Sequence, residues 1–362
     1  MTKRAAIILA GGKGRRFQSK HDEWQDKALA ELLGKPLLVH VAENAREATD
    51  EVIVCVNDES RIAKYSETLK KHKISNVRFV TDEKITHISG PNVAIITGLK
   101  STRADLCITL PCDTPLIKPG IIEYLFDVGE NEQVTVPMWP NGRLETLIMV
   151  LDTICASEIT ETLCRLRRPR SDDIVRGASR VLFVSPMGEM RQLDPNLRSF
   201  VNINHPEDLA KLQTRPAHGT ITTNFKVTLG ALLLPELQRL RETYPMLHEH
   251  EFAEASAVFS ACAAELEKKK SPFWAGISRE KEGETLLTWS QLQKEPEAAT
   301  ELDFKSKDSF LAAAGNYETE AQMHLQGRCR FLAERAWADK AWCESKVMGK
   351  ADCGERYLSR HK

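Results

Sequence analysis

The sequence predicts an α/β fold in which a doubly wound, mostly parallel sheet is followed by a mainly α-helical C-terminal domain. From residue 5 to about residue 213, short β-branched runs alternate with amphipathic helical stretches, a pattern typical of a parallel sheet covered on both faces. Beyond residue 216 the strand pattern fades, and Ala-rich helical stretches replace it. The 362 residues suffice for two domains, which we expect at residues 1–215 and 216–362.

The strand candidates are six short apolar runs: Ala5–Ala10, Glu51–Val56, Val77–Val80, Asp105–Leu110, Val134–Met138 and Val181–Val184. The apolar positions within residues 37–45, and those within residues 93–99, share one helical face, so we expect helical connections between strands. A further run, Ser199–Ile203, precedes a helix that Asn204 is placed to cap. In the tail, Ala and aromatic positions repeat after twenty residues, which predicts two helices packed as a hairpin.

Composition excludes several classes of protein. Fifty Lys and Arg against 51 Asp and Glu give a net charge of −1, so the chain lacks the one-signed field that captures nucleic acid or acidic membranes. No apolar run is long enough to span a membrane. The nine cysteines form no close C-x-x-C pair, which favours reduced core thiols over a zinc site or disulfides. We therefore expect a cytoplasmic protein that binds neither nucleic acid nor membrane.

A glycine-rich turn follows the first predicted strand, in the segment Leu9, Ala10, Gly11, Gly12, Lys13, Gly14, Arg15, Arg16. Three glycines let backbone N–H groups approach a triphosphate, and the guanidinium of Arg16 is suited to hold the phosphates. The spacing matches neither the dinucleotide fingerprint nor the Gly-Lys-Ser/Thr phosphate loop. The alternative is a purely structural turn, since most glycine clusters are turns.

Asp113 lies at the end of another apolar strand, in the segment Cys112-Asp113-Thr114-Pro115. Mg²⁺ prefers carboxylate, phosphate and water oxygens, so one aspartate at this edge of the sheet is suited to hold it against a phosphate. Taken alone, such an aspartate is more often a turn or cap residue. Cys112 has no visible base beside it and is predicted to be a core thiol.

These motifs resemble a known family. The opening L-A-G-G-x-G-x-R, with Lys27 further on, is similar to that of the nucleotidyltransferases that activate a phosphorylated acceptor with a nucleoside triphosphate. The ending Phe200-Val201-Asn202-Ile203-Asn204 resembles that of the molybdenum cofactor guanylyltransferases in particular. The resemblance covers residues 4–213 and implies a Rossmann-like nucleotidyltransferase sheet. The chain departs from the pattern by an insertion, Gln18–Gln25, between Arg16 and Lys27.

The resemblance implies a role for each matching residue. Arg16 and Lys27 would neutralise triphosphate charge, and Asp113 would hold Mg²⁺. Asn202 and Asn204, which alternation aims away from Val201 and Ile203, would contact the acceptor. The nucleotide would be bound by Leu9, Ala10, Gly11, Gly12, Gly14, Asn57, Asp82, Gly90 and Pro91. Asn57 and Asp82 are equally well explained as ordinary residues that follow strands.

The implied function is Mg²⁺-dependent transfer of GMP from GTP to the phosphate of molybdopterin, with release of pyrophosphate. One alternative is another nucleotidyltransferase, using CTP on molybdopterin or acting on phospholactate, cobinamide phosphate or a sugar phosphate. A second alternative is a catalytically silent nucleotide-binding adaptor. For the helical tail the candidate roles are homo-oligomer formation, contact with a molybdoenzyme partner, and covering the acceptor site.

Overall fold

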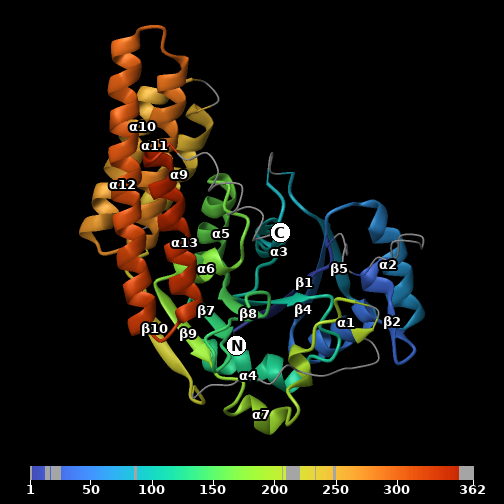
Figure 1. Ribbon diagram of the computed structural model, residues 1–362. Helices are drawn as coiled ribbons and strands as arrows, with labels where there is room; N and C mark the ends of the chain where they lie inside the picture. Colours follow the sequence, from blue (N-terminus) through green and yellow to red (C-terminus); the bar gives the residue numbers. More distant parts are fainter. Residues whose placement is uncertain are drawn as a thin grey trace. The chain divides into compact units, whose positions relative to one another are not determined.

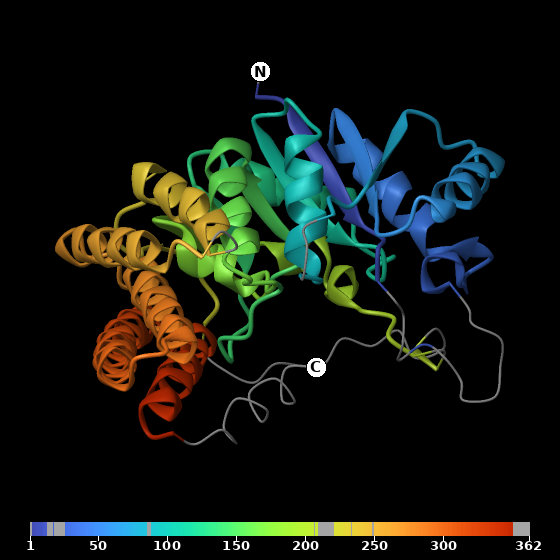
Figure 2. The ribbon, with the colours of Figure 1, turned by 90° about the horizontal axis from the view of Figure 1, so that it is seen from above.

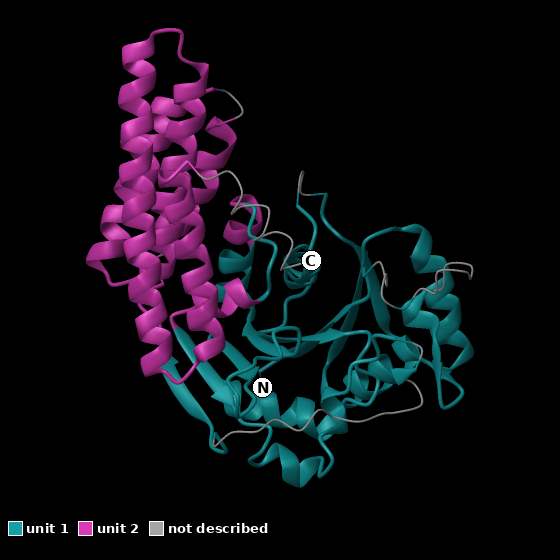
Figure 3. Ribbon diagram, in the orientation of Figure 1, with its two compact units in different colours: residues 1–160, 167–171, 180–227 teal, residues 161–166, 172–179, 228–362 magenta. Residues whose placement is uncertain are grey.

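The computed structural model describes residues 2–12, 17, 26–84, 88–205, 207–208, 221–232, 234–247 and 250–349. The chain forms two compact units, coloured separately in Figure 3. The sheet unit comprises residues 1–160, 167–171 and 180–227. The helical unit comprises residues 161–166, 172–179 and 228–362, so it takes in two short segments from the first half of the sequence.

A central sheet organises the first part of the chain (Figure 1). In the described residues it has eight strands in the order β10-β9-β7-β8-β6-β1-β4-β5. Their bounds are β1 Arg4–Leu9, β4 Glu51–Val56, β5 Val77–Thr81, β6 Leu106–Pro111, β7 Val134–Pro137, β8 Met149–Asp152, β9 Arg180–Val184 and β10 Phe225–Thr228. β1 pairs in parallel with both β4 and β6, and β8 runs antiparallel to β6 and β7. The predicted mostly parallel sheet is confirmed.

All six predicted strands are present, because strands buried on both faces leave a continuous apolar run in the sequence. Three described strand features were not predicted: β8, β10, and the small hairpin of β2 (Glu31–Leu32) and β3 (Lys35–Pro36). Each of these strands has only two to four residues. Such segments are too short for a periodic pattern to stand out.

The run Ser199–Ile203 is not a strand, which corrects the prediction. A 3₁₀ turn, η2 (Arg198–Phe200), is followed by irregular chain. The Ile203 N–H donates to the Asp113 carbonyl at 2.8 Å, so this backbone group bonds to a loop and not to a neighbouring strand. Phe200 packs edge to face on Trp139, with ring centroids 5.5 Å apart. The run is apolar because it covers the core.

Helices connect the strands, as expected. Their bounds are η1 Lys27–Leu29, α1 Leu37–Ala48, α2 Ser60–Lys71, α3 Pro91–Lys100, α4 Pro119–Gly129, α5 Thr153–Arg165 and α7 Met190–Leu193. α3 approaches β1 closely at Gly98, where a Cβ would lie only 2.4 Å from Cγ2 of Ile7. Of the helix predicted after Asn204, the structure describes residues 207 and 208 alone.

The helical unit is built from long helices that run alongside one another (Figures 1 and 2). They are α9 Leu234–Met246, α10 Phe252–Lys268, α11 Pro272–Leu292, α12 Pro296–Gln326 and α13 Arg330–Val347. The short helix α6, Asp172–Gly177, belongs to the same unit. Ala321 of α12 packs against Ala333, Ala336 and Trp337 of α13, which confirms the predicted hairpin. None of the helices in the described ranges has the length and apolar character needed to cross a membrane.

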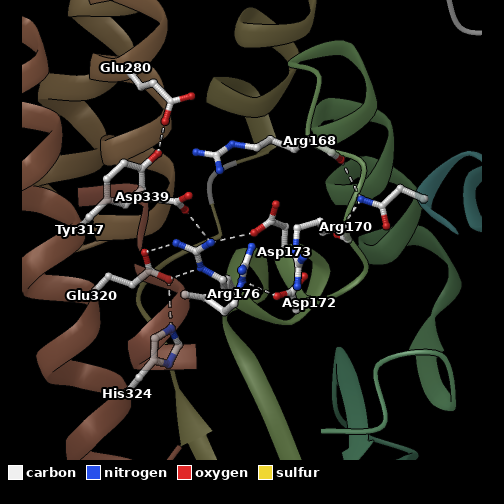
Figure 4. Close-up of polar contacts among 12 residues, drawn as sticks. Arg168, Arg170, Asp172, Asp173, Arg176, Glu280, Tyr317, Glu320, His324 and Asp339 are labelled. Carbon is white, nitrogen blue, oxygen red and sulfur yellow. Dashed lines mark hydrogen bonds and ion pairs between the residues drawn. The ribbon is translucent and has the colours of Figure 1, made fainter. Parts of the chain in front are cut away.

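A buried ion cluster holds α6 within the helical unit (Figure 4). The Arg176 side chain is fully buried and is surrounded by three carboxylates. Its Nε and Nη2 donate to Glu320 at 2.6 and 2.9 Å, and its Nη1 donates to Asp173 and Asp339, each at 2.8 Å. His324 Nε2 lies 3.0 Å from Glu320 Oε1. Two helices, α12 and α13, are thereby tied to α6 through buried side chains.

Two further contacts of α6 belong to the same core. The indole N–H of Trp274 donates to the Gly177 carbonyl at 2.8 Å. Arg335 Nε lies 2.9 Å from Asp172 Oδ2. Charges buried in this way are tolerated only when they are paired, so the position of α6 is closely specified.

Candidate active site

Gly11 brings two predicted nucleotide-binding residues together at the carboxyl ends of neighbouring strands. β1 ends at Leu9, and the Ala10 N–H donates to the Cys55 carbonyl at 2.9 Å, which continues the pairing with β4. A Cβ on Gly11 would lie 3.1 Å from Asn57 N and 3.2 Å from Asp82 Oδ2. The ends of β1, β4 and β5 therefore converge with Gly11, Asn57 and Asp82 in contact distance, where open α/β sheets bind ligands.

The Asp82 carboxylate is poised to accept hydrogen bonds. Its Oδ1 is buried and has no hydrogen-bond partner among the described residues. Burial raises the pKa of Asp82 to about 6. An unsatisfied buried carboxylate oxygen is costly and rare, so it calls for an explanation such as a bound donor. At pH 7 the ionised group offers two acceptor oxygens for a pair of N–H donors.

A second group of predicted residues meets at Lys27. The Lys27 ammonium lies 2.5 Å from Asp113 Oδ2 and donates to Asn204 Oδ1 at 3.2 Å. The Lys27 and Asp113 side chains are only 13% and 22% exposed. η1 positions Lys27, and the turn after β6 positions Asp113, whose carbonyl accepts from Ile203. Three motifs far apart in the sequence thus form one polar cluster.

An apolar cluster joins Phe17 to the segment that carries Asn202 and Asn204. Phe17, the one described residue between Gly12 and Asp26, is buried against Val201 and Ile203, together with Leu32 and Leu37. Asn202 and Asn204 are partly exposed, whereas Val201 and Ile203, which alternate with them, are buried. The alternation predicted for these four residues therefore holds, although the segment is not a strand. The Asn204 side chain accepts from Lys27.

The remaining predicted residues differ in what the structure says of them. Gly12 faces open space, since a Cβ there would meet nothing within 4 Å. Gly90, with a φ of +155°, is the residue before α3, which begins at Pro91. A Cβ on Gly90 would lie 2.7 Å from the Pro169 carbonyl oxygen. Among the described residues, no hydrogen bond joins Gly90 or Pro91 to Asp82 or to Lys27. Gly14 and Arg16 lie outside the described residues.

Cys112 behaves as the core thiol that the sequence predicts. Burial, together with the neighbouring Asp113 charge, raises the pKa of Cys112 to about 12. The thiol is therefore protonated near neutral pH and is a poor nucleophile.

The donor set fits a Mg²⁺ ion shared with a nucleotide. Among the described residues, no group of three or more His, Cys, Asp or Glu side chains is arranged to hold a metal. Mg²⁺ does not need such a group, because it commonly binds one or two carboxylates, substrate phosphates and waters. Asp113, beside the ammonium of Lys27, would supply one such carboxylate.

Sequence reasoning passed over Arg61 and Tyr65, which touch the glycine-rich loop from α2. Arg61 Nη1 donates to the Ala10 and Gly12 carbonyls at 3.2 and 3.3 Å. The Tyr65 hydroxyl lies 2.8 Å from Asp26 Oδ2. The spacing of four residues puts both on one helix face, but an i, i+4 pair is common and does not by itself mark a site.

Comparison with known proteins identifies the family. Residues 6–181 match the family described as the MobA-like NTP transferase domain. A probable molybdenum cofactor guanylyltransferase from Methanosarcina mazei is 32% identical over 209 residues, which make up 58% of this chain and 89% of that relative. The chain belongs to the MobA-like NTP transferase family. The resemblance stated from the motifs is confirmed.

Other MobA-like proteins match the same part of the chain. The molybdenum cofactor guanylyltransferase of Pseudomonas paraeruginosa is 31% identical over 208 residues, 57% of this chain and 92% of that relative. The solved molybdopterin-guanine dinucleotide biosynthesis protein A of Archaeoglobus fulgidus is 23% identical, covers 58% of this chain and 96% of its own, and superposes with a TM-score of 0.47. As a MobA-like protein, the chain is a nucleotidyltransferase. Residues 228–362 lie beyond the family match.

Proposed function

We propose that the chain transfers GMP from GTP to the terminal phosphate of molybdopterin and releases pyrophosphate. The observation that carries the proposal is the cluster of Lys27, Asp113 and Asn204, because it joins a phosphate-binding, a metal-binding and an acceptor-binding candidate. The relatives named as molybdenum cofactor guanylyltransferases match this part of the chain at about 30% identity. Together these support the specific reaction within the family.

The reaction needs no protein nucleophile. An oxygen of the acceptor phosphate attacks the α-phosphorus of GTP, a new P–O–P bond forms, and the bond to the β-phosphate breaks. The Lys27 ammonium offsets negative charge as it builds up on the α-phosphate and the leaving pyrophosphate. Mg²⁺ held by Asp113 would supply further charge neutralisation at the phosphates. Asn202 and Asn204 orient the acceptor, so positioning provides much of the rate.

Guanine recognition is assigned to Asp82 and Asn57. A carboxylate accepts both the N1–H and an N2–H of guanine, and cytosine does not present that pair of donors. Two observations support this assignment: Asp82 Oδ1 has no hydrogen-bond partner among the described residues, and the other carboxylate oxygen, Oδ2, lies beside Gly11. We therefore expect GTP to be preferred over CTP, ATP and UTP.

The test is pyrophosphate release with Mg²⁺, molybdopterin, and each of the four nucleoside triphosphates in turn. Release with GTP is the expected result, and Asp113→Ala should reduce it at least about 100-fold, since an electrostatic contact at the reacting phosphate is lost. Asp127→Ala is the matched control, because Asp127 pairs with Arg4 in an exposed position on α4. Full activity of Asp113→Ala would refute the role given to that residue.

The same assay separates the alternatives. Turnover with CTP, or only with another phosphorylated acceptor, would make the chain a different nucleotidyltransferase. GTP binding without turnover on any acceptor would favour the nucleotide-binding adaptor.

A further inference from the structure

Helix α2 holds both ends of the glycine-rich loop through two side chains one turn apart. Arg61 Nη1 donates to the carbonyls of Ala10 and Gly12, at 3.2 and 3.3 Å, where the loop leaves β1. The Tyr65 hydroxyl donates to the Asp26 carboxylate, with oxygens at 2.8 and 3.0 Å, where the loop ends. Arg61 and Tyr65 also lie within 3.5 Å of each other. Only residues 13–25 separate the two points in the sequence.

The contact at Asp26 is transmitted directly to Lys27. Asp26 Oδ1 accepts the Ala28 N–H at 3.1 Å and so caps η1, the turn that carries Lys27. The Lys27 ammonium in turn reaches Asp113 and Asn204. Asp26 is thus held by Tyr65 on one side and fixes the start of η1 on the other. A shift of Asp26 would shift the ammonium relative to Asp113.

Tyr65 is suited to act as a permanent donor. Its side chain is fully buried in the core of the sheet unit. Burial and the neighbouring Asp26 charge raise the pKa of Tyr65, so the hydroxyl keeps its proton. Arg61 contributes in a different way, because one guanidinium nitrogen bridges the carbonyls of Ala10 and Gly12. This contact holds the backbone directly after β1 in place.

We propose that Arg61 and Tyr65 are positioning residues for the nucleotidyl transfer reaction. Arg61 fixes the backbone of Ala10 and Gly12, and Tyr65, through Asp26, fixes Lys27 against Asp113. Backbone groups that are already fixed in the free protein need not be ordered when a triphosphate binds, so holding Ala10, Gly12 and Asp26 lowers the entropic cost of binding. Geometry matters because a misplacement of about 1 Å can lower a rate about 100-fold. The expected effect on kcat rests on the proposed function. The measurements of GTP binding and of amide hydrogen exchange, described below, do not depend on it.

The first variant is Tyr65→Phe, which removes one oxygen and leaves the ring in place. We expect kcat to fall about tenfold while the KM for GTP changes less than about twofold. The Lys27 ammonium is displaced, but Arg61 still holds Ala10 and Gly12. Hydrogen exchange at the Ala28 amide should become faster in the free protein. The matched control is Tyr124→Phe, which removes a partly exposed hydroxyl that accepts from Asn224 Nδ2 at 2.8 Å. The control should match the unmutated protein in both readouts.

The second variant is Arg61→Lys, which keeps the charge but replaces the planar guanidinium by a single ammonium. We expect the Kd for GTP with Mg²⁺ to rise about tenfold, because the backbone of Ala10 and Gly12 must then be fixed at the expense of binding. Arg78→Lys is the matched control, since Arg78 pairs with Glu51 away from the loop. Equal loss of affinity in both variants would overturn the role of Arg61, as would unchanged affinity in Arg61→Lys.

The outcomes for the two proposals are distinguishable. Absence of turnover by the unmutated protein, with every nucleotide and acceptor, contradicts the proposed function; the exchange rate at Ala28 and the Kd for GTP still decide on Tyr65 and Arg61. Unchanged exchange in Tyr65→Phe overturns the positioning role whether or not the protein is active. Faster exchange with an unchanged kcat overturns it as well, because the contact would then be structural only.

Discussion

Replacing Arg176 by methionine should strongly destabilise the helical unit. The Arg176 side chain is fully buried, and its four hydrogen bonds to Glu320, Asp173 and Asp339 measure 2.6 to 2.9 Å. The guanidinium also lies over the Phe273 ring, 4.6 Å from its centroid. Methionine fills part of the volume but leaves three buried carboxylates without this cation. Removing one partner of a buried ion pair typically costs about 3–5 kcal/mol, a large part of the 5–15 kcal/mol that usually stabilises a folded domain.

The loss should depend on pH in a defined direction. Burial pushes the pKa of Glu320 upward, but the charge and hydrogen bonds of Arg176 bring it below its usual value. A lowered carboxyl pKa contributes stability above the unfolded value of 4.5, and that stability is lost as pH falls through the lowered value. Without Arg176, burial is opposed less and the pKa of Glu320 rises. In the variant, Glu320 takes up a proton as the pH falls and is then buried without charge, which costs less stability. The difference in unfolding free energy between Arg176→Met and the unmutated protein should therefore shrink from pH 7 to pH 5.

Urea unfolding followed by tryptophan fluorescence measures this loss, since four of the six tryptophans lie in the helical unit: Trp274, Trp289, Trp337 and Trp342. Arg279→Met is the matched control, because Arg279 pairs with Glu267 and Glu282 in a partly exposed position on α11. Such a pair is worth at most about 1 kcal/mol. If Arg176→Met lost no more stability than Arg279→Met, or if its loss grew toward pH 5, the reasoning about the buried cluster would be wrong.

Three further predictions concern the sheet unit. Affinity for GTP should fall as the pH drops through about 6, where Asp82 takes up a proton. Titration calorimetry at pH 5.5 and 7.5 measures this affinity, and equal Kd values at the two pH values would show that Asp82 does not bind the base. Because the pKa of Asp82 is raised, its ionised carboxylate lowers the folding stability above pH 6. Asp82→Asn should therefore raise Tm at pH 7.5 and weaken GTP binding. A lowered Tm would contradict this. Gly98→Ala should destabilise the protein by about 1–3 kcal/mol, because the new Cβ would overlap Ile7, whereas Gly12→Ala, which faces open space, should leave urea unfolding nearly unchanged.

The sheet and part of the site were predictable because both depend on local patterns. β1 and β4 are almost wholly apolar, and parallel strands end at one edge, so residues that follow them were expected to converge. Gly11, Asn57 and Asp82 do so. The resemblance of the motifs to the family also predicted that Lys27, Asp113 and Asn204 belong to one site.

Other features depend on packing between distant segments and leave no local pattern. Ser199–Ile203 looks like a strand because its apolar residues cover the core, although it lacks a strand's pairing. Tyr65 is one of several apolar or aromatic residues on an amphipathic helix, and only the position of Asp26 gives its hydroxyl a role. Arg176 and Glu320 are 144 residues apart, so the sequence shows a charged residue in a short helix and nothing of its partner.

The place of α6 in the helical unit affects how the chain is made. A ribosome releases Arg176 well before Glu320 and Asp339, which follow 144 and 163 residues later. At about 5–20 residues per second, synthesis of that stretch takes about 7–30 seconds. Throughout this interval the guanidinium and α6 have no finished bundle to enter, although most of the sheet has already been translated. Until the last two helices emerge, α6 therefore lacks the carboxylates of Glu320 and Asp339 that bind its arginine in the folded protein.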